Sequence, residues 1–141
     1  MGRIAPFPLS GSILSSVSDM CRFLKLQLRD GSASGPPPIV AVGSLRETWL
    51  PVARTDARGG SAGMGWLIRA SGRGRVLRQD GGLPGFTARI ELVPEHQLGL
   101  VAFVNETPRL QRERRHGIAQ ITRLIRDQLI PITPATAPPS L

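Results

Sequence analysis

The chain has 141 residues, of which 40% are hydrophobic and 20% charged, and its formal net charge is +8. This length allows one domain with a single core, and the composition excludes an intrinsically disordered protein. There is no run of about 18 apolar residues and no apolar signal-peptide core near Met1, so we expect no transmembrane helix and no signal peptide in this sequence. The single cysteine, Cys21, excludes an intrachain disulfide and is expected to be a small core residue.

The first clear helix is predicted to begin at Ser16. Asp19 follows three residues later, so the pair forms a capping box that satisfies unpaired backbone N–H groups. Helical spacing then places four apolar side chains on one face: Met20, Phe23, Leu24 and Leu28. Gly31 suits the position that ends the helix.

A glycine-, serine- and proline-rich linker over residues 31–44 separates this helix from the next elements. Residues 44–49 are predicted to form a short helix capped by Ser44, and residues 51–62 a polar loop. A strand is expected to start within residues 63–68, with its partner at residues 75–78 after a glycine-containing turn.

Residues 86–105 read as a β-hairpin. A glycine-rich corner over residues 81–86 leads into an apolar run, a polar turn at residues 94–97 and a second apolar run that ends at Asn105. With the two preceding strands, the sequence predicts a mainly antiparallel sheet of about four strands.

The last helix is predicted to open at Thr107-Pro108, with threonine as the cap and proline at the first helical position. One apolar stripe follows helical spacing and is expected to cover the sheet: Ile118, Ile121, Ile125 and Leu129. Pro131 ends this helix, so residues 1–130 are expected to form the domain and residues 131–141 a proline-rich mobile tail.

Four blocks of sequence follow one another in an order that resembles the C-terminal part of the serine β-lactamase-like hydrolases. They are the helix entry Gly11–Leu24, the segment Gly63-Met64-Gly65-Trp66, the corner Gly81–Phe86, and the turn and strand Pro94–Asn105. This family includes penicillin-binding proteins, esterases and D-aminopeptidases. The resemblance implies an α/β fold with a helix before and after the sheet, and hydrolysis of an amide or ester through an acyl-serine intermediate.

Two of the three catalytic motifs of that family are missing. Its nucleophile lies in Ser-x-x-Lys, but the only lysine here is Lys25, and Arg22 stands three residues before it. The chain has no tyrosine for Tyr-x-Asn, and Ser18-Asp19-Met20 is not Ser-Asp-Asn. We therefore predict no catalytic residue, and a fragment or truncated form of a hydrolase whose missing motifs belong to an N-terminal part. A small amide, ester or peptide substrate is expected only together with that part.

The third motif is represented by Gln79, Asp80 and Gly81, where the family has Lys-Thr-Gly or His-Ser/Thr-Gly. The resemblance implies that this strand lines the substrate cleft, which makes the three residues a candidate remnant of a substrate site. Gln79 can still donate a hydrogen bond but carries no charge. The simpler interpretation, which we favour, is that Gln79 and Asp80 are polar residues near a turn at a sheet edge.

Other function classes remain open as alternatives. Arginine dominates the positive charge, with six arginines in residues 54–78 and six in residues 107–127, so an anionic surface or nucleic acid could be attracted. Aromatic residues make up only 4%, which argues against nucleic acid stacking. His96 and His116 lack clustered carboxylates, and residues 81–85 lack a P-loop ending, so neither a metal nor a cofactor is expected. A non-catalytic binding module and a self-associating chain are the further alternatives.

Overall fold

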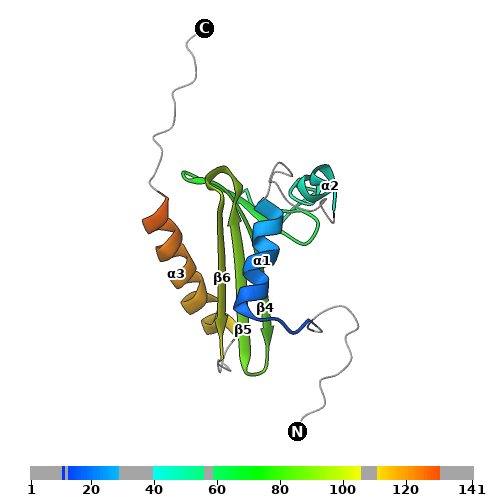
Figure 1. The fold of residues 1–141 in the computed structure, drawn as a ribbon. Helices are drawn as coiled ribbons and strands as arrows, with labels where there is room; N and C mark the ends of the chain where they lie inside the picture. Colours follow the sequence, from blue (N-terminus) through cyan, green and yellow to red (C-terminus); the bar gives the residue numbers. More distant parts are fainter. Residues whose placement is uncertain (1–10, 12, 29–39, 56–58, 106–110, 131–141) are drawn as a thin grey trace.

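The computed structural model describes residues 11, 13–28, 40–55, 59–105 and 111–130. These residues form a six-stranded antiparallel sheet in which the strands lie in chain order, β1 to β6. Figure 1 shows this sheet with helix α1 (Val17–Leu28) in front of it and helix α3 (Gln111–Leu129) at its other side. The short helix α2 (Val42–Glu47) lies beyond one end of α1. The structure thus confirms an α/β fold in which the sheet is flanked by an N-terminal helix, α1, and a C-terminal helix, α3, with the short α2 in addition.

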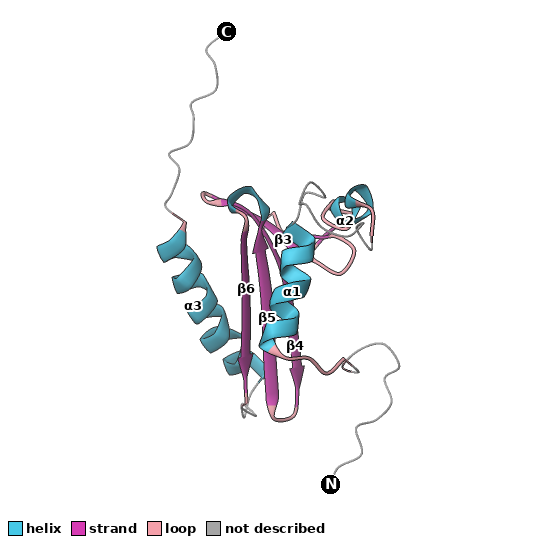
Figure 2. Ribbon diagram, in the orientation of Figure 1, coloured by secondary structure: helices cyan, strands magenta, loops and turns pink. Residues whose placement is uncertain are grey.

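The sheet contains two more strands than the sequence suggested. The strands are β1 (Ala53–Arg54), β2 (Ser61–Ala62), β3 (Leu67–Ser71), β4 (Gly74–Leu83), β5 (Phe86–Val93) and β6 (Leu98–Val104), as coloured in Figure 2. The two-residue strands β1 and β2 lie in the segment that was expected to be a loop. Strand β4 also continues through Gly81 and Gly82, so the expected corner is reduced to Pro84 and Gly85, with φ +88° at Gly85.

The face of the sheet that carries α1 is closed by an apolar core. Leu24 of α1, two tryptophans and apolar residues of three strands form one buried cluster: Leu24, Trp49, Trp66, Ile68, Leu77 and Leu92. The indole Nε1 of Trp49 donates a 3.1 Å hydrogen bond to Oε1 of buried Gln27, so the polar edge of that ring is satisfied inside the core. Ser16 Oγ accepts the backbone N–H of Asp19 at 3.1 Å, which confirms the predicted cap of α1.

In two of the sequence blocks, the backbone conformation or close packing requires glycine. A Cβ atom at Gly63 would lie 2.5 Å from the Thr48 carbonyl oxygen, and Gly65 adopts φ +82°. A Cβ atom at Gly99 of β6 would lie 3.1 Å from Cβ of Leu24, so glycine allows α1 to approach the sheet closely. These glycines therefore set the join between α2 and β3 and the join between α1 and β6.

The prediction that one apolar stripe holds α3 on the sheet is wrong. Ile118 is buried, but Ile121 is 52% exposed, Ile125 43% and Leu129 60%. The residues that α3 buries are Ile118, Thr122 and the following Ile130, together with most of the Arg126 side chain. The physical reason is that the sheet presents charged side chains to this helix, and these select a polar partner face.

Two local predictions also fail. Cys21 is exposed on α1 and is not a core residue. Ser44 lies inside α2, whose cap residue is Ala41 and has no side-chain hydrogen bond to the helix end. Thr107-Pro108 and the predicted tail at residues 131–141 lie outside the described residues, as does most of the 31–44 linker. Within the described ranges, no helix is long and apolar enough to cross a membrane.

Candidate functional site

The second half of β4 carries Gln79, Asp80 and Gly81, the three residues that stand at the place of the family's third catalytic motif. Gln79 pairs with Ile90 of β5, Asp80 with Arg89 and Gly81 with Ala88. Strand β3 pairs with β4 only from Gly74 to Arg78, so the segment from Gln79 onward has β5 as its one neighbouring strand among the described residues. This segment therefore lies at a local sheet edge, as the simpler interpretation expected, although β4 as a whole is an interior strand.

Gln79 and Asp80 point to opposite faces of the sheet, because side chains alternate along a strand. Gln79 is exposed and stands beside Ile90, which packs against the α1-side core. Asp80 lies on the α3 side, where its Oδ1 accepts a 2.6 Å charge-assisted hydrogen bond from Nε of Arg89. The two polar residues are thus not brought together toward one ligand, and Asp80 has a partner within the fold.

Asp80 is the outer end of a buried ionic network that the sequence did not reveal. Glu91 is 2% exposed at its side chain, and its Oε2 accepts a 2.8 Å hydrogen bond from Arg126 of α3. Its Oε1 accepts a 3.0 Å hydrogen bond from Thr122 Oγ1 and lies 3.5 Å from NH1 of Arg89. A buried carboxylate needs such partners because desolvation of an unpaired charge costs several kcal/mol. The network joins β4, β5 and α3.

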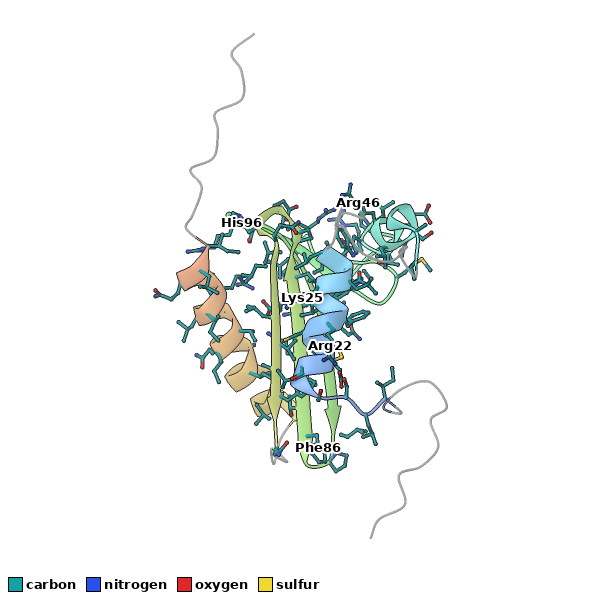
Figure 3. All side chains as sticks on the ribbon, viewed as in Figure 1. Arg22, Lys25, Arg46, Phe86 and His96 are labelled. Atoms are coloured by element: carbon teal, nitrogen blue, oxygen red, sulfur yellow. The ribbon has the colours of Figure 1, made fainter. Side chains whose placement is uncertain are left out.

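A serine nucleophile with an adjacent base is not found in the described part of the chain. The Ser16 hydroxyl caps α1 and donates to the Asp19 carboxylate at 2.8 Å, and the Ser15 hydroxyl donates to the Ser16 carbonyl at 3.3 Å. Lys25 is exposed on α1, one turn beyond Arg22, whose NH1 pairs with Asp19 at 2.7 Å. Figure 3 shows Arg22 and Lys25 on the same helix.

His96 does not join the β4 segment. It belongs to the 3₁₀ turn Pro94–His96 between β5 and β6 and is exposed. Figure 3 places His96 at one end of the sheet and Phe86, which begins β5 after the Pro84-Gly85 turn, at the other. The side chain of His116 lies outside the described residues, and the described residues contain no group of histidine, cysteine and carboxylate side chains that could hold a metal ion.

Comparison with known proteins places the chain in a family. The Beta-lactamase family model matches residues 3–123. The solved octameric penicillin-binding protein homologue from Pyrococcus abyssi shares the fold with a TM-score of 0.58 at 19% sequence identity. That similarity covers 77% of this chain and 24% of the other, so this chain spans about a quarter of that protein's length. A comparison with curated protein sequences found no match. Because the family model covers most of its length, the chain belongs to the Beta-lactamase family.

Proposed function

We propose that these 141 residues form the C-terminal part of a serine hydrolase of the Beta-lactamase family and that they are not catalytic by themselves. In this proposal, the complete hydrolase cleaves an amide or ester through an acyl-serine intermediate. The sheet and its two helices supply one wall of the site, and a part of the family fold that this chain does not contain supplies the nucleophile and its base.

The observation that carries the proposal is the absence of a serine–lysine pair. A serine hydroxyl is a weak nucleophile at neutral pH and needs a neighbouring group to take its proton. The chain has one lysine, Lys25, and Arg22 occupies the position where Ser-x-x-Lys would have its serine. The guanidinium of Arg22 stays protonated in proteins and cannot replace the serine hydroxyl as the nucleophile.

Open surfaces support the view that a further part of the fold completes this one. Within the described residues, β6 pairs with β5 alone, so its outer edge of backbone groups has no strand partner. The outer face of α3 exposes four large apolar side chains, Ile121, Leu124, Ile125 and Leu129. Contiguous apolar surface of this kind promotes association. We therefore also propose that the chain alone associates with itself, as the octameric Pyrococcus abyssi homologue does by its description.

Gln79, Asp80 and Gly81 are proposed as the vestige of the substrate-lining strand rather than as working contacts. Only Gln79 and the backbone at the open edge of β4 can reach a ligand on the α1 side, because Asp80 is held by Arg89 on the other side. The structure thus supports at most a backbone contact and one amide contact at this strand.

Covalent labelling tests the lack of catalysis. A serine-reactive fluorophosphonate and a β-lactam should leave the intact mass of the purified chain unchanged, since no serine of the sequence has a lysine three residues after it. The variant Gln79→His should remain equally unreactive, because that residue would assist a nucleophile that the chain does not have. Stoichiometric labelling of one serine, located by peptide mass spectrometry and abolished by its change to alanine, would contradict the proposal.

A further inference from the structure

A pocket of about 620 Å³ opens on the α3 side of the sheet, between strands β2 to β5 and the second half of α3. This volume falls within the range of about 300–1,000 Å³ that small-molecule sites occupy. The pocket lies on the opposite face of the sheet from Gln79, because Arg89 and Glu91 line it and Gln79 alternates with Asp80. A ligand in this pocket would therefore not contact Gln79, although Arg89 of the lining also pairs with Asp80.

Arginine dominates the lining of this pocket. Among the described residues that line it are six arginines and two carboxylates, Glu91 and Asp127, and Asp80 beside the lining pairs with Arg89, so the arginines outnumber the carboxylates six to three. The arginines are Arg69, Arg73, Arg78, Arg89, Arg123 and Arg126. Five of them come from the two arginine-rich stretches of the sequence, residues 54–78 and 107–127, which the fold brings together, and Arg89 comes from β5. Guanidinium groups gathered in one partly enclosed space repel one another and favour a bound anion.

The two carboxylates do not neutralise this cluster. Glu91 is saturated by Thr122, Arg89 and Arg126, as described above. Three guanidinium groups converge on the single carboxylate of Asp127 at 3.5–3.6 Å, from Arg73, Arg123 and Arg126. These distances exceed the 2.7–2.9 Å or so of a strong charge-assisted hydrogen bond. The Asp127 carboxylate is therefore shared loosely rather than tightly paired.

Two guanidinium groups retain donors for a ligand. Arg126 Nε is buried and makes no hydrogen bond in the part of the chain that the structure describes, since its ion pair with Asp127 Oδ1 is 3.5 Å long. Arg78 lines the pocket from β4, and its guanidinium takes part in no ion pair with another described residue. A buried donor such as Arg126 Nε is costly unless an acceptor is supplied, whereas Arg78 is half-buried. An anion with several oxygens would satisfy them.

We propose that this pocket binds a small anion of the phosphate type, carrying at least two negative charges. Arginine forks match phosphate oxygens in pairs of hydrogen bonds, which favours this chemistry over a halide. The described residues of the lining include no aromatic side chain on which a nucleobase could stack, so recognition rests on the phosphate groups. Ser61 and Ser71 add hydroxyl-bearing residues to the same lining.

Isothermal titration with inorganic pyrophosphate, at constant ionic strength, tests the proposal on the full 141-residue chain. The chain should bind one pyrophosphate per pocket, and the double variant Arg78→Gln/Arg123→Gln should weaken binding by about tenfold or more. Arg22→Gln/Arg54→Gln is the matched control, because it removes the same two charges at exposed residues that do not line the pocket. It should change the affinity less than about twofold. No binding to the parent, or equal weakening by the control, would overturn the proposal and indicate diffuse attraction to net charge.

A second measurement keeps the test decisive if the double variant does not fold. Phenylglyoxal modifies accessible guanidinium groups, and peptide mass spectrometry reads each arginine separately. In the parent chain, pyrophosphate should protect Arg78 and Arg123 from modification and leave Arg54 unprotected. Equal modification of all three with and without pyrophosphate would contradict the assigned site.

Discussion

The two faces of the sheet are stabilised in different ways. The α1 face is a continuous apolar core around Leu77 and Leu92, both fully buried. The α3 face has a smaller apolar cluster of Val76, Val93 and Ile130, and beside it the Glu91 network and the arginine-lined pocket. The difference shows that one helix is held by hydrophobic burial, whereas the other depends in part on charges that must be paired.

The sharpest test of this comparison uses two isoleucines of the same helix. Ile118→Asp would bury an unpaired charge and should unfold the chain, since the cost is several kcal/mol against about 5–15 kcal/mol of total stability. Ile121→Asp places the same charge at a side chain that is half exposed and should change stability by no more than about 0.5 kcal/mol. Circular-dichroism melts of both variants provide the measurement. Equal loss of stability in the monomer would show that Ile121 is covered as fully as Ile118, and a larger loss for Ile121→Asp that α3 packs by the opposite face.

The buried network should contribute the next largest effect. Glu91→Gln leaves Arg89 and Arg126 without their shared counter-charge and is expected to cost about 3–5 kcal/mol in urea unfolding. Glu95→Gln makes the same chemical change at the exposed Glu95–Arg75 pair, where we expect about 0–1 kcal/mol. If the two variants unfolded at the same urea concentration, the network would not hold α3 to the sheet.

The smallest effects in this series come from changing one leucine to alanine in each of the two long helices, α1 and α3. Leu24→Ala removes a buried side chain from the α1 face and should cost about 2–5 kcal/mol. Leu129→Ala removes the same atoms from an exposed position on α3 and should cost less than about 0.5 kcal/mol. The midpoints of urea unfolding give both changes in the free energy of unfolding, provided that the dependence of this free energy on urea concentration is the same in all variants. Both values refer to protein concentrations at which the chain is monomeric, and a larger loss for Leu129→Ala there would mean that another part of the same chain covers the outer face of α3.

The sequence predicted those elements whose own residues determine their local structure. The α1 cap follows from Ser16 and Asp19, and the β5–β6 hairpin follows from two apolar runs around the Pro94–Gln97 turn, where Gln97 adopts φ +52°. Both depend on neighbours close in the chain, which a sequence pattern records directly.

The packing of α3 could not be predicted in the same way. Apolar periodicity identified Ile121, Ile125 and Leu129, but the helix buries Thr122 and Arg126 because Glu91 lies opposite them. Glu91 and Arg89 alternate with Ile90 and Leu92, a pattern typical of a strand with one solvated face. The sequence signal for this polar face was the i, i+4 spacing of the polar residues Thr122 and Arg126. That spacing can be interpreted only once the strand that packs against the helix is known.

The candidate site was predictable in position and not in detail. Motif order located Gln79, Asp80 and Gly81 on a strand, and β4 contains them. The ion pair of Asp80 with Arg89 depends on the register of β4 against β5. The arginine-lined pocket forms because the fold brings together segments about 50 residues apart in the sequence. Composition alone shows these arginines only as a positive net charge.

The claim that this chain is one part of a larger fold is tested most directly by sedimentation velocity over a range of concentrations. Exposed apolar residues on α3 should make the parent chain sediment as a dimer or larger species, and Ile121→Lys/Leu129→Lys should return it to a monomer. The control Gln120→Lys/Gln128→Lys adds the same charge to exposed polar positions of that helix and should sediment like the parent. A parent that stays strictly monomeric and melts cooperatively would contradict the account and indicate a self-sufficient domain.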